Sequence, residues 1–211
     1  MGVIKEILKK NIRKSEIEEY LRETLKDAFF GGVDIGFSPL GTRVTIYAMR
    51  PGRVIGLRGK TIKEISRVLE EKFGLENPQI AVAEIEVPEL NPYIMASRIA
   101  SAIAKGIRFR RVAFWALKRI MDAGARGVII EISGKTTSAR ARTEKFVEGY
   151  IPRCGDHAVK YLRKASVSVQ LKIGVFGVKV IIYPPDAPIP DSYKVKSSIE
   201  NQKIEEMKND K

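Results

Sequence analysis

The sequence contains few of the residues that build disulfides and metal sites. Its 211 residues include one cysteine, Cys154, and one histidine, His157. One cysteine cannot form an internal disulfide, and this pair supplies too few ligands for a structural zinc ion. We therefore expect Cys154 and His157 to lie in a loop without a metal ion. We also expect that the protein has no cofactor and works in a reducing compartment.

Long apolar runs are missing as well. No stretch approaches the roughly 18 apolar residues of a membrane-spanning helix, and the N-terminal segment 1–14 lacks the apolar core of a signal peptide. Paired acids occur on a predicted strand, at Glu84 and Glu86, and on a predicted helix, at Glu70 and Glu71. Neither pair lies beside a candidate nucleophile or a set of metal ligands. The sequence thus predicts a cytoplasmic protein with no membrane partner, and one that is not an enzyme.

Positive charge is abundant. The chain has 38 Lys and Arg against 25 Asp and Glu, which gives a net charge of +13. Residues 184–211 hold six acids and five lysines, so residues 1–183 carry +14. Such a surface favours polyanions, because each bound phosphate releases counterions. Hydrophobic residues make up 44% of the chain, which is enough for folded domains.

The first part of the chain has the order α-β-β-α-α-β. Ser15 and Glu18 form a capping box, and apolar residues at helical spacing follow until Gly31. Alternating residues predict a hairpin with strands over 33–37 and 44–48 and a turn at 39–41. A short helix, a glycine loop, a longer helix that Gly74 ends and a strand over 80–87 complete this unit.

A second region begins at Asn91, a capping residue followed by proline at the first helical position. Apolar spacing predicts helices over 92–105 and 108–123, and alternation predicts strands over 128–132, 167–173 and 178–183, whereas 135–164 has no clear pattern. We expect two helices packed on a sheet of roughly four strands. The proline-containing segment 184–211 is predicted to be a flexible arm.

A glycine loop lies between the two helices of the first region. Gly56 and Gly59 are separated by two residues, and five basic residues with no acid lie from Arg50 to Lys63. Two glycines allow a tight bend and a close approach of the backbone to phosphates, next to the N-terminus of a helix. The same spacing also occurs in ordinary turns between helices, and it is too short for a nucleotide-binding P-loop.

Within this element order, the loop resembles that of a KH domain of the second type, which carries its extra helix and strand at the N-terminus. The resemblance implies that the loop clamps the backbone of a single-stranded nucleic acid. It also implies a type II KH domain over residues 15–90.

The second region resembles that of ribosomal proteins of the S-three family, in an archaeal or eukaryotic form. The resemblance covers residues 15–183 and rests on short motifs over 91–93, 109–111, 123–127, 133–135, 139–142, 144–149 and 174–180. It implies a structural protein of the small ribosomal subunit, with residues 91–183 as a C-terminal α+β domain. Expected partners are ribosomal RNA, messenger RNA and neighbouring head proteins of the S-ten and S-fourteen families.

A basic stretch runs from Arg98 to Arg119 with seven Lys and Arg residues and no acid. Arg110 and Arg111 begin the second of the two helices, and no carboxylate of the stretch can pair with them, so phosphate contact is favoured over a merely solvated face. The resemblance implies that this pair lines the channel through which messenger RNA enters. Phe114 replaces a third basic residue of the bacterial pattern. Phe114 and Trp115 are predicted to be core residues, with stacking on bases as the less favoured alternative.

The sequence therefore predicts an α+β protein with two domains that binds RNA through both. The alternatives are an enzyme that nicks or repairs nucleic acid and a free KH regulator of transcripts. A nuclease would need a cluster of metal-binding carboxylates, which the sequence does not offer. The candidate RNA-binding residues are Arg53, Gly56, Leu57, Arg58, Gly59, Lys60, Arg108, Arg110, Arg111, Lys118, Lys135, Arg140 and Arg142.

Overall fold

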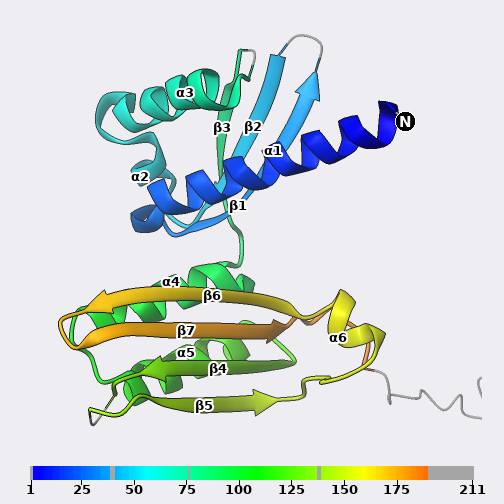
Figure 1. The fold of residues 1–211 in the computed structure, drawn as a ribbon. Coiled ribbons are helices and arrows are strands. Elements are labelled where there is room, and N and C mark those ends of the chain that lie inside the picture. The colour runs from blue at the N-terminus through cyan, green and yellow to red at the C-terminus, as the bar shows by residue number, and fades with distance from the viewer. Residues whose placement is uncertain (1, 39–40, 76, 137–138, 190–211) are drawn as a thin grey trace, which may run out of the picture.

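The structure is a computed structural model that describes residues 2–38, 41–75, 77–136 and 139–189. It contains two domains, one above the other in Figure 1. The first domain has the order α-β-β-α-α-β of a type II KH domain, as predicted. Its elements are α1 (Gly2–Thr24), β1 (Phe30–Ser38), β2 (Gly41–Ala48), α2 (Pro51–Ile55), α3 (Lys60–Phe73) and β3 (Gln79–Glu84).

The KH sheet has β2 in its centre. β2 pairs antiparallel with β1 and parallel with β3, because α2 and α3 carry the chain back across the sheet. Alternate β2 residues are fully buried against the apolar sides of α1 and α3. α3 ends where the sequence predicts, at Gly74, whose φ of 60° is the left-handed conformation typical of a residue just after a helix. The predicted turn over 39–41 lies mostly outside the described residues.

Two predicted boundaries of the first helix are wrong. Ser15 lies inside α1, since α1 begins at Gly2, and the residues between them are mostly good helix formers. The helix also ends early, at Thr24, and Gly31 belongs to β1. A Cβ at Gly31 would come within 2.2 Å of Ile85 Cδ1, so this glycine serves close packing and does not end a helix.

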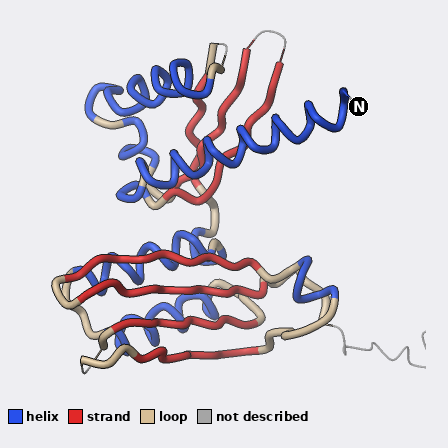
Figure 2. Tube along the Cα trace, viewed as in Figure 1, coloured by secondary structure: helices blue, strands red, loops and turns tan. Residues whose placement is uncertain are grey.

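The second domain has two helices on one face of a four-stranded antiparallel sheet, as predicted (Figure 2). The strand order is β5-β4-β7-β6, so that β5 and β6 form the two edges. Large apolar residues of β4 and β7 meet the helices in a continuous core. The elements are α4 (Pro92–Ala104), α5 (Phe109–Asp122), β4 (Gly127–Gly134), β5 (Arg142–Gly149), α6 (Asp156–Lys160), β6 (Arg163–Leu171) and β7 (Gly174–Tyr183).

The stretch 135–164, which has no clear sequence pattern, supplies the edge strand β5 and the short helix α6. The segment after β7 also differs from the flexible arm that was expected. The Tyr183 hydroxyl donates a hydrogen bond to the carbonyl of Pro188, Arg126 Nε donates to the carbonyl of Pro185 at 2.8 Å, and Ala187 is 1% exposed. Residues 184–189 therefore pack on the second domain, and residues 190–211 lie outside the described part of the chain.

A small set of contacts joins the two domains. The side chain of Asn91 accepts hydrogen bonds from the backbone of Tyr93 and Ile94, as expected of a helix cap, and its Nδ2 also donates to the carbonyl of Gly31 in β1 at 2.8 Å. The Arg22 guanidinium lies over the Tyr93 ring, 4.6 Å from its centroid. One capping residue thus fixes the start of α4 and ties it to the KH sheet.

Candidate nucleic-acid interface

The glycine loop has an unusual backbone. Gly56, Arg58 and Gly59 have φ values of 72°, 54° and 74°. The two glycines are needed for different reasons. A Cβ at Gly56 would come within 2.2 Å of Thr61 Oγ1, whereas a Cβ at Gly59 would meet only Ile62 Cγ2 at 4.0 Å. Gly56 is therefore required by space and by conformation, and Gly59 by conformation alone.

The side chains of the loop point outward. Leu57 is 88% exposed at the tip, and Arg58 and Lys60 are exposed beside it. α3 begins at Lys60 without a side-chain cap, and the Lys60 N–H donates to the carbonyl of Leu57 within the loop. Arg53 stands apart from this group, because its Nη1 donates to the carbonyl of Asp27 at 3.4 Å. The structure thus joins positive charge, a helix start without a side-chain cap and an apolar tip in one turn.

The cations of α5 lie on two sides of the helix. Arg108 and Arg110 line a hollow of about 530 Å³ together with Lys135, which follows β4. Arg111 lines a different hollow of about 490 Å³ between α4 and α5, with Trp115. Consecutive residues of a helix point in directions about 100° apart, so the arginine doublet reaches both sides of α5.

Arg110 has a carboxylate partner, which corrects the sequence-based view of an unpaired doublet. Its Nε and Nη2 donate to the two oxygens of Glu144 on β5, each at 3.0 Å. The hydrogen bond, followed by the opposite charge, raises the pKa of Arg110. The same hydrogen bond is the largest cause of the lowered pKa of Glu144. Arg110 remains 65% exposed, so Glu144 orients it on the surface without burying it.

A second carboxylate, that of Glu89, binds the first and the last arginine of the basic stretch. Glu89 Oε1 accepts from Arg119 Nε at 2.9 Å and from Arg98 Nη1 at 3.4 Å, and both guanidiniums lie over the ring of Trp115. Burial of Glu89 raises the pKa of its carboxyl. Its backbone hydrogen bond, the hydrogen bond from Arg119 and the two positive charges outweigh burial, so the pKa lies below its ordinary value.

The prediction that Phe114 and Trp115 are core residues is wrong. Their side chains are 62% and 42% exposed. The aromatic rings lie outside because other residues form the buried face of α5, namely Val112, Ala113, Ala116, Leu117 and Ile120. Phe114 packs edge-on against Phe146 of β5 at 5.4 Å. The rings of Phe114 and Trp115 therefore lie on the exposed surface of α5, where its arginines also lie.

The remaining predicted residues spread over this surface. Lys118 lines a hollow of about 500 Å³ that it shares with Glu89 and Trp115, and Arg140 and Arg142 are exposed at the start of β5. Sequence reasoning missed the bracing residues Glu89, which lies 30 positions from Arg119, and Glu144, which lies 34 positions from Arg110. Only a correct strand assignment for β5 would have placed Glu144 beside α5, and the stretch 135–164 has no clear sequence pattern that indicates this strand.

Two further findings concern the described residues only. They contain no group of three or more His, Cys, Asp and Glu side chains that could hold a metal ion, and Cys154 is exposed and free. None of their helices has the length and apolar character required to cross a membrane.

Comparisons with known proteins agree with this architecture. Residues 16–90 match the family model of the KH domain, and residues 99–182 match that of the ribosomal protein S3 C-terminal domain. Small ribosomal subunit protein uS3 of Methanothermobacter thermautotrophicus is 50% identical over 187 residues, which cover 89% of this chain and 72% of the relative. The protein of the same name from Archaeoglobus fulgidus is 46% identical, over 93% of this chain and 85% of the relative.

These relatives are ribosomal proteins of archaea, which confirms the predicted resemblance and its archaeal character. They also confirm that the chain is a structural protein and not an enzyme. Identity at this level extends over both domains and over most of each relative. The chain therefore belongs to the ribosomal protein S3 family.

Proposed function

We propose that this chain binds ribosomal RNA in the head of the small ribosomal subunit and lines the channel through which messenger RNA enters. Membership of the S3 family supports the ribosomal role, and the net charge of +13 supports a polyanionic partner. RNA contacts are assigned to two surfaces. The first is the glycine loop (residues 56–60), and the second is the α5 surface, which consists of Arg108, Arg110, Arg111, Lys118, Lys135, Arg140 and Arg142.

The observation that carries this proposal is the geometry of the glycine loop. Three of its residues have positive φ, its cations are exposed, and α3 begins at the same place without a side-chain cap. A backbone in this shape approaches a sugar-phosphate chain without interference from Cβ atoms. Loops of this kind clamp the backbone of single-stranded nucleic acid in KH domains.

The α5 surface supports contact with a moving strand. Arg110 and Arg111 line two different hollows beside α5, and a guanidinium binds phosphates without reading the base sequence. The exposed Phe114 adds a ring on which an unpaired base can stack, a contribution of about 1 to 3 kcal/mol per base, whereas the guanidiniums of Arg98 and Arg119 already lie over the ring of Trp115. Neighbouring proteins of the S-ten and S-fourteen families are proposed partners in the head.

Sedimentation of a cell lysate tests the assignment to the ribosome. The chain is expected to co-sediment with small subunits and whole ribosomes in a sucrose gradient, and to remain there at moderate salt. Chemical crosslinking of messenger RNA in purified ribosomes should then map to α5. A chain that stays at the top of the gradient, bound to selected transcripts, would indicate a free KH regulator instead.

A further inference from the structure

β6 is an edge strand whose outer backbone groups have no partner in the described residues. It has nine residues and pairs only with β7, and it contains no proline. A two-residue turn joins the strands, and Leu171 faces Gly174 at its base. The two residues that flank such a turn form a hydrogen-bonded pair, and along the two strands such pairs alternate with pairs that are not hydrogen-bonded. The N–H and C=O groups of every second β6 residue therefore point away from β7. These residues are Lys164, Ser166, Ser168 and Gln170.

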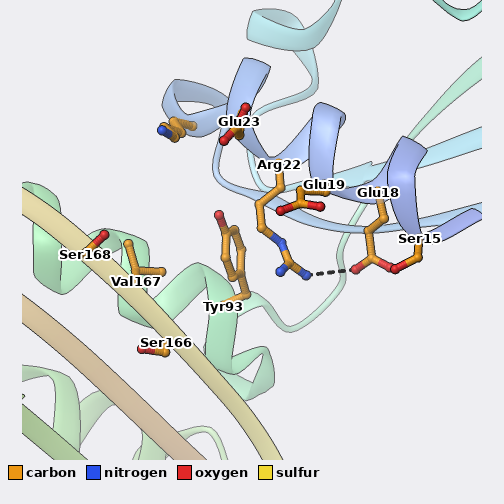
Figure 3. A pocket seen from close by; sticks show the side chains of 10 residues that line it. Ser15, Glu18, Glu19, Arg22, Glu23, Tyr93, Ser166, Val167 and Ser168 are labelled. Carbon is orange, nitrogen blue, oxygen red and sulfur yellow. Dashed lines mark hydrogen bonds and ion pairs between the residues drawn. The ribbon is translucent and has the colours of Figure 1, made fainter. Parts of the chain in front are cut away.

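A cleft runs along this free edge, between the two domains (Figure 3). α1 forms one wall and β6 the other, and Tyr93 lies between them. Two adjoining hollows of about 430 and 510 Å³ make up the cleft, and both include Ser166. An added strand lies about 4.8 Å from its neighbour, so it would occupy the space beside β6 that these hollows provide.

The charge of the cleft differs between its two hollows. Glu18, Glu19 and Glu23 line the hollow that contains Ser166 and Ser168, with two cations, Arg22 and Lys26, whereas Arg163 and Lys164 of β6 line the adjoining hollow. Arg22 already pairs with Glu18 at 2.9 Å and stacks on Tyr93. In the described part of the chain, Glu19 and Glu23 form no ion pair. The hollow beside Glu19 and Glu23 therefore favours lysine or arginine side chains over phosphates, and the hollow beside Arg163 and Lys164 does not.

We infer that the cleft binds an extended, lysine- or arginine-containing segment of a neighbouring protein, which adds to the sheet as a strand beside β6. The outward groups of β6 supply backbone hydrogen bonds, and Glu19 and Glu23 select basic side chains. This inference concerns a protein partner, and it goes beyond the RNA contacts proposed above. It needs neither the glycine loop nor the α5 surface.

The experiment uses a nine-residue peptide of alternating lysine and valine as the probe, with a glutamate and valine peptide as its counterpart. Hydrogen exchange of the full chain is measured with and without each peptide. The basic peptide is expected to slow exchange at Ser166 and Ser168, and the acidic peptide is expected to leave it unchanged. A single-stranded RNA of similar length should not protect these amides.

Two double variants separate backbone pairing from side-chain contact. Ser166→Pro with Ser168→Pro removes outward N–H groups and leaves the ladder to β7 intact, so peptide affinity should fall about tenfold or more. The matched control, Ser166→Ala with Ser168→Ala, keeps these donors and should bind like the parent. Glu19→Lys with Glu23→Lys should weaken binding as the proline variant does.

Binding of RNA to each variant is measured in parallel, so that failure here is distinguished from failure of the proposed RNA function. The proline variant is expected to keep the RNA affinity and the melting temperature of the parent within a few degrees. The inference is overturned if the basic peptide does not bind the parent, if it binds the proline variant equally well, or if RNA protects β6.

Discussion

The two candidate RNA surfaces are built in opposite ways. In the glycine loop the backbone itself is shaped, with positive φ at Gly56, Arg58 and Gly59, and the charged side chains are exposed. On α5 the backbone is an ordinary helix, and carboxylates from other segments orient the side chains, as Glu144 does for Arg110. The loop therefore depends on residues that are close in sequence, and the α5 surface depends on tertiary contacts. Disturbing the loop and disturbing the bracing carboxylates should have different consequences.

The largest expected effect is that of Gly56→Ala, compared with Gly59→Ala. The first substitution adds a Cβ that collides with Thr61 at positive φ, and the second adds strain from φ alone. We expect losses of about 3 kcal/mol and about 1 kcal/mol in the free energy of unfolding. Urea unfolding of both variants measures them. Equal losses would mean that the loop relaxes around Thr61.

Glu89→Gln tests the bracing of Arg98 and Arg119. The Glu89 carboxylate is 15% exposed, and its neutral replacement leaves two guanidiniums close together, so stability at pH 7 should fall by about 2 kcal/mol. The pKa of Glu89 is lowered in the folded chain. Its contribution is thus complete above the ordinary value of about 4.3 and is lost as the pH falls through the folded pKa.

The difference in melting temperature between the parent and Glu89→Gln should therefore shrink when the pH is lowered from 7 towards 3. A matched substitution, Glu70→Gln, changes an exposed carboxylate of α3 and should have little effect at either pH. If the difference stays constant with pH, Glu89 acts through packing and not through its charge.

Arg58→Asp with Lys60→Asp should weaken binding of single-stranded RNA by about tenfold and leave the fold intact. Loss of two phosphate contacts should reduce the logarithmic salt slope by about 1.4. The control, Arg67→Asp with Lys72→Asp, makes the same change of charge at the far end of α3. Similar losses in both variants would show that net charge matters and that the loop does not.

Arg110→Ala with Arg111→Ala should change RNA affinity by only a few-fold. Phe114 takes the place of a third cation, and other basic side chains remain on α5. Reconstituted subunits should assemble but pass stable hairpins more slowly than unstructured messages. Parental speed through hairpins, or a failure to assemble, would assign the doublet to ribosomal RNA instead.

Glu144→Gln refines this test, since it frees Arg110 without removing it. RNA affinity is expected to rise slightly, by about twofold, because an RNA phosphate no longer competes with the Glu144 carboxylate for the guanidinium of Arg110. An affinity below that of the parent would show that orientation by Glu144 is worth more than the competition it causes.

The sequence predicts local features of this molecule well and distant pairings poorly. Asn91 as a helix cap and Gly74 as a helix end were predicted, because each acts within a few residues of its partners. The glycine loop was recognised for the same reason. The packing of Trp115 was predicted incorrectly, because its surroundings come from Arg98 and Glu89, which lie outside α5.

The start of α1 shows a different limit. Ser15 and Glu18 have the spacing of a capping box, but the preceding residues are themselves good helix formers, and the helix continues through them. A capping box marks the start of a helix only when the residues before it have low helix propensity. Likewise, nothing near Arg110 in the sequence pointed to Glu144, because β5 lay in the stretch without a pattern.

With the RNA contacts proposed above, the junction at Asn91 makes the chain a bivalent ligand. The two candidate RNA surfaces are joined by a short segment and a few contacts, chiefly the Asn91 hydrogen bond to Gly31 and the stacking of Arg22 on Tyr93. Once one surface is bound, the other meets its RNA at an effective concentration in the millimolar range, set by the connecting segment. Two individually weak sites can then hold firmly together while each still releases its own strand.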